Sequence, residues 1–265
     1  MDSPGSLERL LQEIGKSKYR DVEPGLIRGI LAQQLQRYPS EKLAVKATKR
    51  KLHALWDCFA ASPANYRQWI AELREGQINT EELPSWAQGL LAKHQSTRER
   101  LPLLSEFYEQ ILPPLQPVNS VIDVGCGLHP LGIAWMGLGA TTEYTAYDID
   151  LPLIALLNEF FAMAPIHGRA LAVNVLDDIA YPNVDVAFVL KLLPLLDQLE
   201  SKGGLRLLQK LPTPILIVSF PRFSLGQRKP LTIYEKNFAK LIDQEGWRAE
   251  KLEFSTELVF RVRKS

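Results

Sequence analysis

Val121-Ile122-Asp123-Val124-Gly125-Cys126-Gly127 is the stretch of sequence that best indicates the fold. A short apolar run ends in two glycines, as where a buried strand turns sharply towards a ligand. Glycine suits this place because a Cβ would obstruct both the turn and a closely approaching molecule. A dinucleotide fingerprint would place a third glycine at position 130, where this chain has Pro130. The loop therefore favours a nucleoside cofactor without phosphates.

From about residue 118, short apolar runs alternate with helical stretches, which is typical of a parallel sheet with crossover helices. Strands are predicted at residues 120–124, 143–147, 169–175, 184–190, 215–219, 248–254 and 258–263. Only three residues separate the last two strands, so they must pair as an antiparallel hairpin. We therefore expect an α/β fold with a seven-stranded Rossmann-like sheet. Its antiparallel end resembles the class I methyltransferase fold, whereas a dehydrogenase sheet would continue parallel.

Polar side chains follow the second and third predicted strands. Asp148 comes 21 residues after Gly127, where a carboxylate can accept both hydroxyl protons of a ribose. Asn174 and Val175, at the end of the third predicted strand, and Leu176 directly after it would lie beside an adenine, although an ordinary turn has the same composition. The neighbouring acids leave the exact contact open.

The first 112 residues contain no strand-like run and predict a helical N-terminal domain, with the sheet domain covering residues 113–265. Charge is divided along the chain. Residues 1–100 carry 16 basic and 12 acidic side chains, residues 101–217 carry 5 and 12, and residues 218–265 carry 10 and 6. This asymmetry points to a polyanionic partner held by the two ends, although solvated lysine-rich helices would look the same.

Two basic clusters stand out in the N-terminal domain. One interleaves an aromatic residue with Lys16, Lys18 and Arg20, a composition suited to phosphates and a stacked base. The other places Lys42, Lys46, Lys49 and Arg50 on one face of a helix whose opposite face is apolar. Each cluster taken singly is equally consistent with an ordinary solvent-exposed helix face.

Several motifs, in a shared order, resemble the aminoglycoside-resistance 16S rRNA (guanine(1405)-N7)-methyltransferases along nearly the whole chain. They are Lys16-Ser17-Lys18-Tyr19-Arg20, His94-Gln95-Ser96-Thr97-Arg98-Glu99-Arg100-Leu101, the glycine loop with Leu128, Pro130 and Leu131, Lys191-Leu192-Leu193-Pro194-Leu195-Leu196, and Ser219-Phe220-Pro221 with Ser224-Leu225-Gly226 and Arg228.

The resemblance implies S-adenosyl-L-methionine as cofactor and guanine N7 in the decoding site of 16S rRNA as target. It also implies that Arg100 pairs with the methionine carboxylate of the cofactor. Lys191 and Arg228 match basic positions near the target base and are the predicted catalytic pair. The other implied cofactor contacts are Phe59, His94, Gln95, Ser96, Asp123, Gly125, Gly127, Asp148, Asn174, Val175, Leu176 and Leu190, and Arg222 joins the RNA-binding set.

The chain departs from the family pattern at His129, Val175 and Arg222-Phe223. These departures fit a divergent member, a shifted loop register or a different target, such as an adenine N1. A catalytically silent ribosome-binding homologue is a further alternative. Guanine N7 carries a free lone pair and needs no general base, which agrees with the absence of an obvious base in the sequence.

The partner implied by the resemblance is 16S rRNA within the 30S subunit, bound by a monomer. No run approaches the roughly 20 apolar residues of a membrane span, and the charged first residues do not resemble a signal peptide. The two cysteines, far apart in sequence, predict neither a disulfide framework nor a metal site. We therefore expect a cytoplasmic protein.

Overall fold

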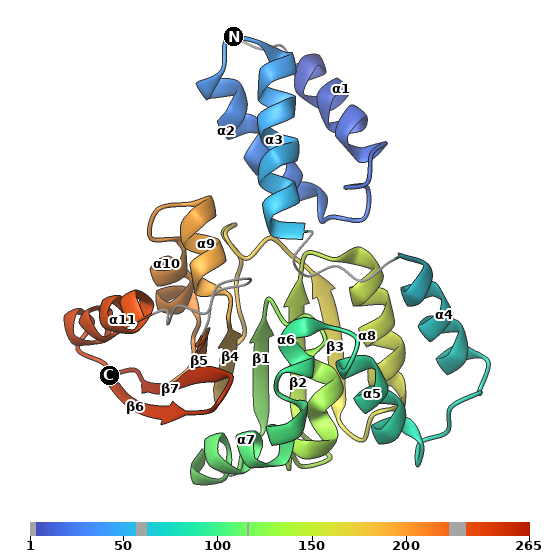
Figure 1. Cartoon of the computed structure of the whole chain (residues 1–265), viewed down its shortest axis with the longest axis vertical. Coiled ribbons are helices and arrows are strands. Elements are labelled where there is room, and N and C mark those ends of the chain that lie inside the picture. Colours follow the sequence, from blue (N-terminus) through green and yellow to red (C-terminus); the bar gives the residue numbers. More distant parts are fainter. Residues whose placement is uncertain (1–3, 57–62, 116, 223–231) are drawn as a thin grey trace.

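The computed structural model describes residues 4–56, 63–115, 117–222 and 232–265, and its centre is a seven-stranded sheet (Figure 1). The strand order is β3-β2-β1-β4-β5-β7-β6. Strands β1 to β5 pair in parallel, and β7 runs antiparallel to both β5 and β6. The strands are β1 Ser120–Val124, β2 Glu143–Asp148, β3 His167–Ala172, β4 Val186–Leu190, β5 Ile215–Pro221, β6 Arg248–Glu253 and β7 Glu257–Arg263. This arrangement confirms the predicted class I methyltransferase sheet and its terminal hairpin.

Helices cover both faces of the sheet, because neighbouring residues of each central strand point to opposite sides. Val121 packs into a core shared with α4, α5, α7 and α8. Ile122, the next residue, packs with α9, α10 and α11. These helices are α4 Pro63–Arg74, α5 Leu83–Leu91, α7 Leu104–Ile111, α8 Leu151–Met163, α9 Leu193–Leu199, α10 Gly203–Lys210 and α11 Thr232–Gln244.

The helices of the N-terminal half of the chain pack in two different places. Only α1 Pro4–Gly15, α2 Pro24–Arg37 and α3 Glu41–Trp56 form a separate helical unit with a core of their own. Figure 1 shows this unit standing beyond the carboxyl ends of β1 and β4. The helices α4, α5 and α7, which also precede residue 113, bury their apolar faces against the sheet instead.

A short backbone connection ties the helical unit to the sheet domain. Val22 forms an antiparallel bridge with Asp150, and two hydrogen bonds flank it. The Glu23 amide donates to the Ile149 carbonyl at 2.8 Å, and the Leu151 amide donates to the Asp21 carbonyl at 2.9 Å. The helical unit is thus fixed directly beside the end of β2.

Several predicted strand boundaries differ from the structure by one or two residues, and the largest difference is the end of β3. Strand β3 begins at His167 and ends at Ala172, whereas the prediction continued to residue 175. It ends early because Asn174 starts a turn, its side-chain oxygen accepting from the Leu176 amide at 3.2 Å. Strand β4 begins at Val186, since the Val184 amide donates instead to the Pro212 carbonyl.

Candidate cofactor pocket and its surroundings

A pocket opens at the carboxyl ends of the parallel strands, where ligands bind in open α/β sheets. Each of β1 to β4 contributes residues to it from the loop that follows the strand, and the segment around α6 Gln95–Arg98 and the helical unit complete the lining. The lining residues are Leu26, Leu55, His94, Ser96, Thr97, Arg100, Gly125, Cys126, Gly127, His129, Asp148, Ile149, Asp150, Leu153, Val173, Asn174, Val175, Leu190, Lys191, Leu192, Leu195, Leu196 and Leu199.

The glycine loop has the conformation that the sequence predicts. Gly125 and Gly127 have φ angles of 62° and 50°, a region that residues with a Cβ rarely adopt. A Cβ on Gly125 would also lie 2.8 Å from the Leu192 side chain. After the loop the chain enters a 3₁₀ helix, η3 His129–Trp135, with Pro130 in its first turn. Both glycines therefore allow the turn, and Gly125 also allows the close contact with Leu192.

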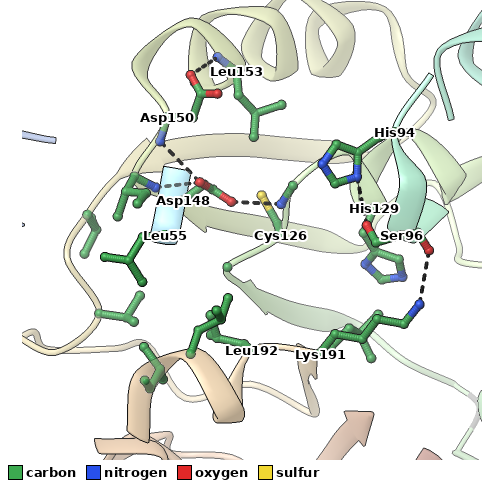
Figure 2. A pocket seen from close by; sticks show the side chains of 18 of the residues that line it. Leu55, His94, Ser96, Cys126, His129, Asp148, Asp150, Leu153, Lys191 and Leu192 are labelled. Atoms are coloured by element: carbon green, nitrogen blue, oxygen red, sulfur yellow. Dashed lines mark hydrogen bonds between the residues drawn. The ribbon is translucent and has the colours of Figure 1, made fainter. Parts of the chain in front are cut away.

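Asp148 lies at one end of the pocket (Figure 2). Its carboxylate accepts hydrogen bonds from the amides of Gly127 at 2.9 Å and Ile149 at 2.7 Å. Burial raises the pKa of Asp148, and these amide bonds oppose the shift. A third amide, that of Asp150, donates to the same oxygen as Ile149 at 3.2 Å. These bonds hold the carboxylate at the pocket wall, and Oδ2, which accepts only from Gly127, keeps a lone pair for a ligand hydroxyl.

Asp150 is a second acid of the pocket that the prediction missed. It begins α8 as its N-cap, where its side chain accepts from the Leu153 amide at 3.2 Å. Its other oxygen accepts from the Tyr66 hydroxyl at 3.1 Å. Burial raises the pKa of Asp150 to about 7. Since an aspartate followed closely by proline is a helix-start signal, the capping role could have been found in the sequence.

Arg100 lies in the pocket wall and is already paired. Its Nε and Nη2 donate to the two carboxylate oxygens of Glu257 at 2.7 and 2.9 Å. Both side chains are buried, with exposed fractions of 5% and 0%. Although burial raises the pKa of Glu257, the charges of Arg100 and Lys191 outweigh it and lower that pKa to about 2. The predicted pairing with a ligand carboxylate would therefore fall to Nη1 and the remaining Nη2 hydrogen.

Lys191 directly follows β4 in the left-handed conformation, with a φ of 57°. Such a conformation costs a lysine about 1–2 kcal/mol and is found preferentially at functional sites. The Lys191 ammonium group reaches the Ser96 carbonyl at 3.3 Å and Glu99 at 3.4 Å. The Ser96 hydroxyl lies 2.9 Å from Nδ1 of His94. Lys191 is thus held against the segment that precedes the sheet.

Not every predicted cofactor residue lines the pocket. Asp123 is buried under the glycine loop, where it accepts hydrogen bonds from Tyr144 and His129. Leu176 lines an adjoining hollow with Asp177 instead. Asn174, Val175 and Leu190 do line the pocket. Phe59 and Arg228 lie outside the described residues, and so does the side chain of Gln95.

Comparison with known proteins agrees with this geometry. The family model described as "Ribosomal RNA methyltransferase (FmrO)" matches residues 16–261. The chain belongs to this family. It is 32% identical to the 16S rRNA (guanine(1405)-N(7))-methyltransferase of Micromonospora echinospora, with 97% of each chain covered. The enzyme of that name from Serratia marcescens is 30% identical, with 97% of this chain and 98% of the relative covered.

Solved structures of such methyltransferases share the whole fold. The 16S rRNA methyltransferase RmtF, solved in complex with S-adenosyl-L-homocysteine, superposes with a TM-score of 0.81 at 30% identity and full coverage of both chains. The 16S rRNA methylase RmtB superposes with a TM-score of 0.80 at 27% identity, covering 99% of this chain and all of that one. The family resemblance read from the sequence motifs is thereby confirmed.

The basic residues predicted to bind RNA in this family member differ in their surroundings. Lys16, Lys42, Lys46 and Arg50 are exposed on the helical unit. Others have protein partners: Lys49 pairs with Glu13 at 3.3 Å, Lys18 lies 3.1 Å from Nδ1 of His53, and Arg20 lies 3.6 Å from Asp21. Arg222 donates to the Phe254 carbonyl at 3.1 Å and lies 3.5 Å from Glu253.

The aromatic residue within the first basic cluster does not offer a stacking surface. Tyr19 is 4% exposed and packs in the core of the helical unit. Its hydroxyl donates to the Lys49 carbonyl at 2.9 Å. The suggestion that a base stacks there was wrong, because this tyrosine ties the chain segment to α3.

In the part of the chain that the structure describes, no helix is long and apolar enough to cross a membrane. Nor do the described residues contain a group of three or more histidine, cysteine, aspartate or glutamate side chains that could hold a metal ion.

Proposed function

We propose that this protein transfers the methyl group of S-adenosyl-L-methionine to N7 of a guanine in the decoding site of 16S rRNA. The observation that carries the proposal is the match, along nearly the whole chain, to relatives that bear this activity in their names. The pocket at the carboxyl ends of the strands supports it, because its two ends differ in the way that a nucleoside linked to an amino acid requires.

The residues of the pocket fit this cofactor. Asp148 would accept hydrogen bonds from the ribose hydroxyls, and the turn at Asn174 and Val175 would border the adenine. Arg100 would contact the methionine carboxylate from the other end. The apolar side chains along the wall, Leu192 among them, would exclude water from the sulfonium. When bound, the cofactor supplies a methyl group activated for in-line displacement.

The chemistry asks little more of the protein than alignment. Guanine N7 presents a lone pair, so no side chain has to remove a proton from it. We assign Lys191 to the target base or its phosphates, because its strained backbone and its contact with the Ser96 segment place its ammonium group at the pocket wall. Arg228, as the second basic residue of this set, is proposed from the family motif alone.

We further propose that the helical unit docks the enzyme on the assembled 30S subunit. Its exposed Lys16, Lys42, Lys46 and Arg50 supply cationic charge for phosphates. The bridge between Val22 and Asp150 joins this unit to the chain segment beside Asp148, so docking would bring the pocket to the RNA.

The test is expression of the protein in a bacterium susceptible to aminoglycosides. The proposal predicts resistance to 4,6-disubstituted deoxystreptamines and a borohydride- and aniline-sensitive site at a single 16S guanine. An Asp148→Ala variant at equal expression should restore susceptibility and remove the cleavage. Cells with an unmodified guanine and unchanged susceptibility would contradict the proposal.

A further inference from the structure

His129 is a pocket residue whose imidazole has one nitrogen without a hydrogen-bond partner among the described residues. The residue lines the pocket and is only 4% exposed. Its Nδ1 lies 2.8 Å from Oδ2 of Asp123, whereas Nε2 is buried without a hydrogen-bond partner in the structure. Leaving a buried polar atom unpaired is costly, so such an atom at a pocket indicates a ligand that pairs with it.

The surroundings of the imidazole fix which nitrogen carries the proton. Oδ2 of Asp123 also accepts a hydrogen bond from the Tyr144 hydroxyl at 2.9 Å, and burial raises the pKa of Tyr144, so this hydroxyl stays protonated. The carboxylate oxygen is therefore an acceptor for both neighbours, and Nδ1 must donate to it. In the neutral ring Nε2 then holds a lone pair and accepts hydrogen bonds.

The ring cannot easily turn this lone pair elsewhere. Phe188 meets His129 edge-on with ring centroids 4.9 Å apart, and Tyr108 lies on another side at 5.8 Å. Figure 2 shows His129 near Ser96 and Lys191, at the far end of the pocket from Asp148. The imidazole is thus held at the end where the methionine part of the cofactor would lie.

This inference rests on the proposed function. If the ligand is S-adenosyl-L-methionine, its chemistry decides which of its groups can donate a hydrogen bond to Nε2. The hydrogen-bond donors of the cofactor are the adenine amino group, the ribose hydroxyls and the α-ammonium group. The first two belong at the Asp148 end. We infer that Nε2 of His129 accepts a hydrogen bond from the α-ammonium group, so that Arg100 and His129 together recognise the two charges of the amino acid.

Isothermal titration of the full chain with S-adenosyl-L-homocysteine, and with its analogue in which hydrogen replaces the α-amino group, tests this. A hydrogen bond to a charged group predicts that the wild type prefers the amino compound roughly ten- to hundredfold. His129→Phe should lose most of this preference, through weaker binding of the amino compound alone. His167→Phe, at an exposed histidine outside the pocket lining, is the matched control.

Equal loss of affinity for both compounds in His129→Phe would overturn the inference and leave the proposed function intact. Failure of the wild type to bind either compound would overturn both. If His129→Phe does not fold, nitrogen-15 spectra of the wild type decide. Nε2 should give the signal of an unprotonated nitrogen that shifts with the amino compound and not with its analogue, and a protonated Nε2 in the free protein would contradict the assignment.

Discussion

Arg100 and Glu257 form a buried ion pair that joins the segment before β1 to the start of β7. Desolvation of the two charges offsets much of their attraction, so the pair adds little net stability over apolar residues of the same size. Removing one partner is different, because the other charge is left buried and uncompensated. The pair also sets which hydrogens of Arg100 can reach a ligand.

Replacement Glu257→Gln should lower the free energy of unfolding by about 3–5 kcal/mol, the cost of stranding a buried charge. The pKa of Glu257 is depressed from 4.5 to about 2, so its stabilising contribution is complete above the higher value and is lost as the pH falls towards the lower one. Urea unfolding across this pH range should therefore show that the difference in free energy of unfolding between the variant and the wild type becomes smaller as the pH falls. Glu109→Gln, at an exposed glutamate, is the control and should change stability by less than about 0.5 kcal/mol.

Asp150 has the opposite pH dependence. Its pKa is raised to about 7, so the folded protein binds a proton that the unfolded chain releases near pH 4. Between these values its contribution to stability falls as the pH rises. Asp150→Asn keeps the N-cap and removes the titration. As the pH rises from 4 to 7, the free energy of unfolding of the variant should increase relative to that of the wild type by up to about 1.4 kcal/mol per pH unit. Thermal or urea unfolding measures this, and a constant difference between the two proteins over this range would refute it.

At the residue scale the sequence predicts what depends on neighbours along the chain. Gly125, Gly127 and Asp148 follow strands and could be placed from local pattern alone. Glu257 could not, because its partner lies 157 residues away. Tyr19 was misjudged because composition shows that an aromatic lies among lysines, but not which way it faces.

The loop between β1 and η3 is the element that shapes the pocket. Its two glycines are needed for different reasons. Gly127 has open space where a Cβ would be, so only its positive φ restricts it. Gly125 combines a positive φ with the close contact to Leu192, a residue of the segment after β4.

Gly127→Ala should therefore cost about 1–2 kcal/mol of stability and leave most cofactor affinity. Gly125→Ala should cost more and weaken S-adenosyl-L-homocysteine binding at least tenfold, because the loop or Leu192 must move. Adding Leu192→Ala to Gly125→Ala should recover part of the folding stability by relieving the contact. Calorimetry and thermal unfolding of the three variants check this, and equal effects of the two glycine replacements would contradict the account.

The existence and direction of all seven strands could be predicted, since apolar runs of strand length are a local property. Their ends could not always be placed. The apolar Val173 and Val175 extend the strand-like pattern beyond β3, yet Asn174 between them folds its side chain onto the Leu176 amide. Hydrogen bonding of this kind outweighs the apolar pattern at a strand end.

At the scale of the whole molecule, the helical unit and the sheet domain meet beside Asp148, at one end of the pocket. The packing partners of the N-terminal helices could not be read from the sequence, because α4, α5 and α7 have the same helical pattern as the helices before them. Their apolar faces pack on the sheet domain, whereas α1 to α3 pack on one another. Helical pattern gives the buried face of a helix, but not the element that covers it.

If the helical unit docks on RNA, reversing its charge should weaken binding of the 30S subunit without weakening binding at the cofactor pocket. Lys42→Glu, Lys46→Glu and Arg50→Glu combined should leave affinity for S-adenosyl-L-homocysteine within about twofold and should reduce binding to 30S subunits by one to three orders of magnitude at moderate salt. The control combines Arg169→Glu, Lys202→Glu and Lys210→Glu, three exposed basic residues in the acidic middle part of the chain. Equal losses in both triple variants would indicate an effect of net charge alone.

The central claim is that this chain methylates one guanine of 16S rRNA at N7. The most direct measurement incubates the purified protein with 30S subunits from a susceptible bacterium and S-adenosyl-L-methionine labelled in the methyl group. The account predicts incorporation that approaches one methyl per subunit, recovered as 7-methylguanosine from a single position of the decoding site. Label recovered in another nucleotide, or none while S-adenosyl-L-homocysteine still binds, would contradict it.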